Sequence, residues 1–365
     1  MIADTRKMYE LKLKLQEILT KDRYFSEMLD GFIEGGMLTK EKYEEFANEF
    51  KCLGKLDELE VLTKEEVMAN PYLSNIKLPN IVENNIKLAN KRIVFANRVA
   101  AYREKYLDLE TFTSINSYFI CERTLRFPAV VEGETNIPWM TVEPQEIESF
   151  KAFIDEAKGN ILLGGCGLGY VPYMLSLKDD VESITIVELN NDIVEMFNKH
   201  ILPQFENKQK ITVVQADAIE YIKNNDLSKY NYINIDIWRD IYDMLYLYLP
   251  CLEVEKNNPN ITFSYWLEPE LKLMIQKSIL RYIAGMEDEQ PLYNAIARTI
   301  VDNTDIRNIC DVRECIRLDD LREVLYMWYI THIYEFEELK EKSEAFVKHI
   351  MKTSEQMLKF AKEHK

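Results

Sequence analysis

The sequence predicts an α/β protein whose centre is a doubly wound, mostly parallel sheet. Two observations predict the sheet: short apolar strands alternate with helical stretches, and a glycine-rich turn follows the first of these strands. A third observation concerns the flanks, where long segments almost free of glycine and proline predict an α-helical N-terminal region and a helical C-terminal extension. With 365 residues, the chain is long enough for two domains.

Residues 1–112 are predicted to form the α-helical N-terminal region. Leu11, Leu15 and Leu19 recur at helical spacing, and the segments 40–50 and 81–107 are long and nearly free of helix breakers. The composition changes in residues 113–145, which are rich in β-branched and aromatic residues and contain a turn signal at 133–136. We expect a small β-hairpin in this connector.

Residues 146–285 are predicted to form the core of five strand and helix units. The expected strands are 160–165, 184–189, 210–216, 230–236 and 260–266. The expected helices begin at or near Tyr170, Asn191, Asp217, Asp240 and Pro269. Because successive parallel strands are joined by right-handed crossovers, this alternation indicates a parallel sheet covered by helices.

Residues 286–365 are predicted to form the helical C-terminal extension. From Glu335 onward, one long amphipathic helix is expected, with these residues on its inner face: Phe336, Leu339, Phe346, Ile350 and Met357. The segment 326–336 is the candidate for a further strand at the edge of the sheet. The helical extensions also suggest a homodimer, although the apolar stripe fits packing on the chain's own core equally well.

Charge and composition narrow the classes of partner. The chain has 45 Lys and Arg against 62 Asp and Glu, a net charge of −17, which disfavours nucleic acid and anionic membrane surfaces as partners. No apolar run of 18 residues occurs, and the N-terminus lacks the pattern of a secretory signal. Six dispersed cysteines fit reduced thiols, so we expect a cytoplasmic protein without a metal site.

The strongest chemical signal is the glycine-rich segment from Leu163 to Tyr170, which follows a strand and opens a helix. Gly165, Gly167 and Gly169 lack side chains, so the backbone can approach a ligand closely. Such turns serve several nucleotide-type cofactors and also occur as plain tight turns. The dinucleotide fingerprint would need a third glycine where this chain has Tyr170, which argues against a nicotinamide cofactor.

Acidic residues end the next two predicted strands. Glu188 lies about 20 residues after the glycines, where a carboxylate can accept hydrogen bonds from both ribose hydroxyls of an adenosine ligand. Asp217 can accept a hydrogen bond from an adenine amino group, and the neighbouring Ala218 offers its backbone amide. Asp217 also fits the role of a helix N-cap.

Together these motifs resemble a class I S-adenosylmethionine-dependent methyltransferase core with a Rossmann-like fold. The resemblance covers residues 136–266 and is greatest to the spermidine-synthase-like branch; its motifs are residues 161–170, 184–190, 213–222 and 232–238. It implies that the cofactor is S-adenosyl-L-methionine. It also implies that the three glycines hold the methionine part, that Glu188 binds the ribose, and that Asp217 with Ala218 binds the adenine.

The candidate catalytic residue is Asp236, at the carboxyl end of the predicted fourth strand, where open α/β sheets bind their ligands. By resemblance, Asp236 matches the first Asp of an aminopropyltransferase motif, whose other positions differ here. We expect Trp238, Asp240 and Trp139 to shape the acceptor pocket. For the tryptophans, core packing is the simpler interpretation.

The sequence therefore predicts a methyltransferase that acts on a small-molecule acceptor, with a protein acceptor as an alternative. In methyl transfer the protein mainly aligns the acceptor with the methyl group and accepts a proton, here at Asp236. Two other hypotheses remain open. One is a polyamine aminopropyltransferase that uses decarboxylated S-adenosylmethionine. The other is an inactive core that only binds the cofactor or a partner.

Overall fold

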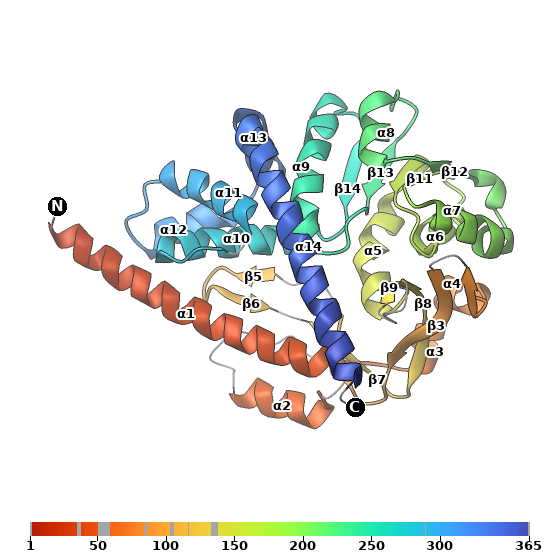
Figure 1. The fold of residues 1–365 in the computed structure, drawn as a ribbon, viewed down its shortest axis with the longest axis horizontal. Helices are drawn as coiled ribbons and strands as arrows, with labels where there is room; N and C mark the ends of the chain where they lie inside the picture. Colours follow the sequence, from red (N-terminus) through yellow and green to blue (C-terminus); the bar gives the residue numbers. More distant parts are fainter. Residues whose placement is uncertain are drawn as a thin grey trace.

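The computed structural model describes residues 2–34, 38–49, 59–83, 86–102, 106–115, 117–132, 138–288 and 290–363. Its centre is a five-stranded parallel sheet in the order β12, β11, β10, β13, β14 (Figure 1). The strands are β10 (Gly159–Gly164), β11 (Val181–Glu188), β12 (Ile211–Gln215), β13 (Tyr232–Ile235) and β14 (Thr262–Tyr265). This order is 3-2-1-4-5 along the chain, the order of a doubly wound sheet. The predicted fold class is confirmed.

Helices cover both faces of this sheet because successive strand residues point to opposite sides. Leu162 packs into one apolar core with helices α8 (Ala218–Asn224), α9 (Ile241–Asn257) and α10 (Glu268–Ala284). Ile161 and Leu163 pack into a second core with α5 (Pro144–Glu156), α6 (Tyr170–Ser176) and α7 (Asn191–Met196). Short π and 3-10 segments continue α7: η1 (Phe197–Ile201), η2 (Leu202–Gln204) and η3 (Lys208–Lys210). The predicted strands and helices of the core are thus present.

The prediction of an all-helical N-terminal region is wrong. Helices α1 (Ile2–Glu34), α2 (Lys40–Glu49), α3 (Lys64–Met68) and α4 (Pro71–Asn75) are present, but the segment 81–107 contains strands. These are β2 (Ile81–Glu83), β3 (Ile86–Val94), β4 (Val99–Ala101) and β5 (Tyr106–Asp108). Ile86 and Leu88 are buried on either side of the less buried Lys87, which is the alternation of a strand. β3 pairs with β8 (Leu125–Glu132), which supplies hydrogen bonds from a distant part of the chain.

The predicted hairpin is present as β8 and β9 (Pro138–Thr141), which pair antiparallel. Its expected turn, 133–136, lies outside the described residues. The hairpin belongs to a larger antiparallel sheet in the order β2, β3, β8, β9. Two small sheets complete this region: β1 (Glu60–Leu62) with β7 (Tyr118–Cys121) and β4, and β5 with β6 (Thr113–Ile115).

The C-terminal extension is helical, as predicted. It contains α11 (Pro291–Asp302), α12 (Ile309–Arg317), α13 (Leu321–Thr331) and α14 (Ile333–Glu363). The candidate strand at 326–336 is helical instead: Leu321, Leu325, Trp328 and Tyr329 are buried at helical spacing in α13. The described residues 266–288 and 290–363 contain no sixth or seventh strand.

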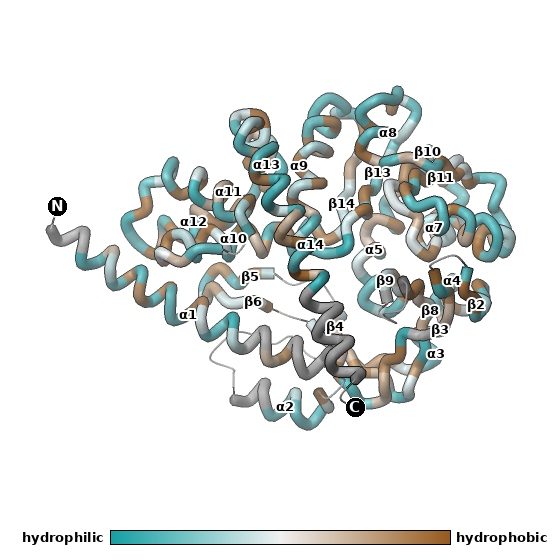
Figure 2. Tube along the Cα trace, viewed as in Figure 1, coloured by the Kyte–Doolittle hydropathy of each residue, from teal (hydrophilic) through white to brown (hydrophobic). Residues whose placement is uncertain are grey.

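The terminal helices pack on the core. α1 packs against α10, α14 packs against α9 and α11, and both long helices are prominent in Figure 1. Phe336 is buried, and Leu339 packs beside it against the same core; the side chain of Met357 lies outside the described residues. Hydrophilic and hydrophobic residues are interleaved along α1 and the first part of α14 (Figure 2). No helix in the described part of the chain is long and apolar enough to cross a membrane.

A guanidinium group joins the C-terminal extension to the last units of the core. Arg322 of α13 donates two hydrogen bonds to the Glu268 carboxylate, both 2.7 Å long. It also donates to the Glu255 carboxylate at 2.9 Å and to the Phe263 carbonyl at 3.1 Å. One side chain therefore connects α13 with α9, α10 and β14.

We expect Arg322→Ala to lower the free energy of unfolding by about 2 kcal/mol, because two partly buried carboxylates lose their partner. Urea unfolding measures this change. Arg317→Ala is the control, since Arg317 pairs with carboxylates at the exposed surface and should change stability by about 0.5 kcal/mol or less. Equal effects of the two substitutions would contradict the assigned role of Arg322.

Candidate functional site

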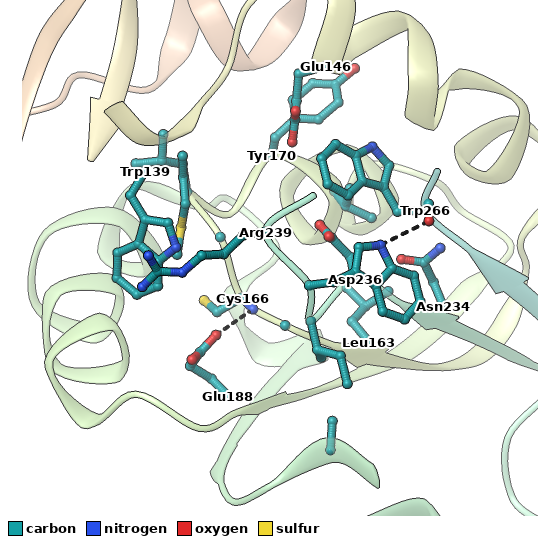
Figure 3. Close-up of a pocket in the computed structure, with 18 of the residues that line it drawn as sticks. Trp139, Glu146, Leu163, Cys166, Tyr170, Glu188, Asn234, Asp236, Arg239 and Trp266 are labelled. Atoms are coloured by element: carbon teal, nitrogen blue, oxygen red, sulfur yellow. Dashed lines mark hydrogen bonds between the residues drawn. The ribbon is translucent and has the colours of Figure 1, made fainter. Parts of the chain in front are cut away.

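A cavity of about 730 Å³ opens at the carboxyl ends of the parallel strands. It lies where the strand order reverses, between β10 and β13, which is the usual ligand position in open α/β sheets. Its walls come from residues 165–168 of the glycine loop (residues 164–169), the ends of β11 and β13, helix α5 and strand β9. Figure 3 shows the side chains that converge on this space.

The glycine loop passes directly over the end of β13. Gly165 has φ +99°, and a Cβ atom there would lie 2.1 Å from the Asp236 carbonyl oxygen. The approach is held from both sides: Gly165 donates its N–H to the Val187 carbonyl and Asp236 donates its N–H to the Gly164 carbonyl, both at 2.8 Å. A side chain at position 165 would therefore separate β10 from β13 at the floor of the cavity.

The other two predicted glycines have different surroundings. Gly167 lines the cavity with φ +51°, and a Cβ atom there would have no neighbour within 4 Å. Gly169 does not line the cavity, because it begins α6 and faces the ring of Phe197, 2.6 Å from where a Cβ atom would lie. The loop thus has two glycines at the ligand side and one packed against η1.

Glu188 lies at the end of β11 and lines the cavity, as the sequence predicts. One carboxylate oxygen accepts the N–H of Cys166 at 2.9 Å, and the other accepts the N–H of Asn190 at 2.8 Å. Because each oxygen has a second lone pair, the carboxylate can still accept hydrogen bonds from a ligand. The same side chain therefore holds the glycine loop and faces the cavity (Figure 3).

Asp217 and Ala218 also line the cavity, at the end of β12. The Asp217 side chain accepts the N–H of Glu220 at 3.0 Å and caps α8. Asp217 is exposed, and Ala218 is buried beneath it. Capping accounts for one oxygen of Asp217 and leaves the other for a ligand.

Asp236 lines the floor of the cavity beyond β13. Burial, together with the negative charge of Glu188, raises the pKa of Asp236 to about 7. In the described part of the chain, no side chain or backbone group donates a hydrogen bond to its carboxyl group. A recessed carboxyl group with a pKa near 7 is suited to general base catalysis.

The structure adds Glu146, which the sequence analysis missed. It lies on α5, and in Figure 3 the Asp236 carboxyl group points toward the side of the cavity where Glu146 lies. Burial and the charges of Asp236 and Glu143 raise the pKa of Glu146 well above its usual range. In the sequence, Glu143 and Glu146 lie at the start of a helix, where acidic residues commonly stabilise the helix N-terminus. This pattern therefore did not distinguish Glu146 as a site residue.

The three residues predicted for the acceptor pocket have different positions. Trp139 lines the cavity, and the guanidinium of Arg239 lies 5.3 Å from its ring centroid. Trp238 is buried in the wall, and its indole N–H donates to the Trp266 carbonyl at 3.0 Å. Asp240 does not line the cavity, because its side chain caps α9 by accepting the N–H of Tyr242 at 2.7 Å.

The cavity is strongly acidic. Among the described lining residues, two carry guanidinium groups and six carry carboxyl groups: Arg92, Arg239, Glu143, Glu146, Glu188, Asp217, Asp236 and Asp243. One guanidinium is already paired, because Arg92 donates to Glu143 at 2.7 Å. The lining therefore favours a ligand that carries positive charge.

No protein-family model matches the sequence, and no curated protein matches it. Solved structures align with parts of the chain. A protein described as an O-methyltransferase from Klebsiella pneumoniae aligns at 17% identity and TM-score 0.26, over 33% of this chain and 55% of that one. This chain thus spans about half the length of that relative.

Two further structures align in the same way. Spermidine synthase from Thermotoga maritima is 14% identical with TM-score 0.28, over 48% of this chain and 68% of that one. The PRMT1 enzyme-prozyme complex with AdoHcy from Trypanosoma brucei is 16% identical with TM-score 0.23, over 32% and 36%. The strand order of the core is that of the doubly wound sheet that the sequence predicts.

We expect Gly165→Ala to destabilise the protein by roughly 3 kcal/mol, because it adds both a backbone clash and an unfavourable positive φ. Gly167→Ala is the matched control: its φ is also positive, but its Cβ enters open space, so a loss of about 1 kcal/mol is expected. Urea unfolding of both variants measures the difference. Similar losses would show that the close approach to Asp236 is unimportant.

Proposed function

We propose that this protein is an S-adenosylmethionine-dependent methyltransferase with a small-molecule acceptor. The observation that carries the proposal is the convergence of Gly165, Gly167, Glu188, Asp217 and Asp236 on one cavity. These residues are far apart in the sequence and share only this edge of the sheet. An adenosyl ligand and a proton acceptor are both needed for methyl transfer, and this cavity supplies groups for both.

The residues present fit the adenosyl ligand. Gly167 leaves open space where a side chain would stand, Glu188 offers acceptor positions for ribose hydroxyls, and Asp217 offers one for the adenine amino group. When bound, S-adenosylmethionine supplies a methyl carbon on a positively charged sulfur, which is strongly electrophilic.

Asp236 acts as the base in the proposed reaction. Bound S-adenosylmethionine would supply the methyl group to the acceptor's nucleophilic atom, and the electron pair of the broken carbon–sulfur bond would remain on sulfur. The acceptor's proton passes to the Asp236 carboxylate. Burial and the charges of Asp236 and Glu143 raise the pKa of Glu146 well above its usual range, which favours its protonated form, and a protonated Glu146 can donate a hydrogen bond to the acceptor.

Because the lining is acidic, the cavity favours a positively charged small molecule as the methyl acceptor. Even without Glu146, the carboxyl groups of the lining outnumber its guanidinium groups by more than the one net positive charge of S-adenosylmethionine. An amine fits this environment, because its ammonium form is attracted to the cavity and its neutral form is the nucleophile that Asp236 releases.

The acidic lining also favours a second candidate, a polyamine aminopropyltransferase. Decarboxylated S-adenosylmethionine lacks the carboxylate that this lining would repel. The two candidates differ in which form of the ligand binds more tightly. Calorimetric titration with S-adenosylmethionine, its decarboxylated form and S-adenosylhomocysteine separates them: tenfold tighter binding of the decarboxylated form would favour aminopropyl transfer.

Glu188→Ala tests the cofactor site. We expect this change to weaken S-adenosylhomocysteine binding roughly 100-fold, because two charge-assisted hydrogen bonds to the ribose are lost. Calorimetric titration gives the affinity. The control is Glu182→Ala, which removes an exposed carboxylate from the other end of β11 and should leave binding unchanged. Wild-type affinity in the Glu188 variant would remove the main support for the proposal.

Asp236→Asn tests the catalytic role. We expect ligand affinity to be kept while turnover falls by about 10² to 10⁴. In the wild type, turnover should rise with pH and level off above about 7, because the base must lose its proton. Glu146→Gln should leave that midpoint near 7, because burial and the charge of Glu188 are what raise the pKa of Asp236. A pH-independent rate in the wild type would argue against Asp236 as the base.

A further inference from the structure

A segment outside the parallel-sheet core is attached to the back of the glycine loop. It includes α4 and extends from Asn70 to Lys77. Tyr72 donates its hydroxyl hydrogen to the Leu168 carbonyl, with an O···O distance of 2.5 Å. Asn75 donates to the Tyr173 hydroxyl at 3.0 Å.

A third attachment follows α4. The Lys77 N–H donates to the Gln204 side-chain oxygen at 2.8 Å, and the Gln204 amide donates back to the Lys77 carbonyl at 3.0 Å. The segment is therefore hydrogen-bonded to the core near Tyr72 and again at Lys77. The hydrogen bond from Tyr72 is made to a backbone carbonyl of the glycine loop.

Leu168 occupies a sensitive place in that loop. The Gly169 N–H donates to the Cys166 carbonyl at 3.0 Å, which closes a four-residue turn with Gly167 and Leu168 at its centre. The peptide group that joins Leu168 to Gly169 is planar, so its carbonyl and N–H turn together. A hydrogen bond to the Leu168 carbonyl therefore fixes the orientation of the whole last peptide group of the turn.

Tyr72 is placed so that this hydrogen bond is rigid. Its side chain is fully buried, and its ring packs edge-on against Tyr170 and Tyr173, with centroid separations of 5.7 Å in each case. Burial raises the pKa of the Tyr72 hydroxyl, so the hydroxyl keeps its proton and stays a donor. Tyr72 does not itself line the cavity.

We propose that Tyr72 is a positioning residue for the ligand-binding loop: the N-terminal segment sets the conformation of the glycine loop through the Leu168 carbonyl. The consequence for ligand binding rests on the proposed function. The consequence for the loop itself does not, because it concerns the protein without ligand.

Tyr72→Phe removes one buried hydroxyl and leaves the ring in place. Without its donor, the buried Leu168 carbonyl is unsatisfied and the turn can leave its binding conformation. We expect amide hydrogen exchange in residues 165–169 to become roughly tenfold faster in the ligand-free protein. We also expect the dissociation constant for S-adenosylhomocysteine to rise roughly tenfold.

Tyr173→Phe is the matched control. It removes a hydroxyl from the same buried aromatic cluster, but that hydroxyl is bonded to Asn75 and not to the loop. A merely structural role of Tyr72 predicts equal effects of the two substitutions. The proposal predicts that Tyr173→Phe lowers the melting temperature to a similar extent while loop exchange and ligand affinity stay within about twofold of the wild type.

Hydrogen exchange in the two variants decides the proposal. Faster amide exchange in the loop of Tyr72→Phe, but not of Tyr173→Phe, supports it, whereas unchanged exchange, or equal changes in both variants, overturns it. If the wild type binds S-adenosylhomocysteine and Tyr72→Phe binds it equally well, the proposal is also overturned. If the wild type binds none of the adenosyl ligands, the proposed function fails, and the exchange comparison still decides the role of Tyr72.

Discussion

The close approach of two backbones, at Gly165 and at the Asp236 carbonyl, is the constraint on which the site depends. It holds the ends of β10 and β13 together at the position where the strand order reverses. Because the chain leaves these two strands in opposite directions, a cavity opens between them. The approach also puts Asp236 on the floor of this cavity, where burial and the charge of Glu188 raise its pKa.

Elements outside the parallel sheet complete the site. Helix α5 supplies Glu146, strand β9 supplies Trp139, and the segment around α4 holds the back of the glycine loop through Tyr72. The sheet therefore supplies one edge of the cavity, and β9 and α5 contribute to the charge and shape of the space beyond it.

Two segments show where sequence patterns misled. In residues 81–107 the absence of glycine and proline suggested a helix, but Ile86 and Leu88 follow strand periodicity, and β8 provides the hydrogen bonds. In residues 326–336 the β-branched and aromatic composition suggested a strand, but Trp328 and Tyr329 are buried at helical spacing. In both cases tertiary packing outweighed local propensity, because burying one face of an element stabilises it more than propensity does.

The sequence by itself determined the five strand and helix units, the glycine loop and the residues that end each strand, since these depend on local periodicity and on short spacings. Glu188, Asp217 and Asp236 were found in this way. Only the tertiary structure decided that Glu146 faces the same cavity as Asp236, that Asp240 and Gly169 lie outside its lining, and that Tyr72 holds the loop. The physical reason is that a side chain's neighbours and burial, and hence its pKa, arise from segments far apart in the chain.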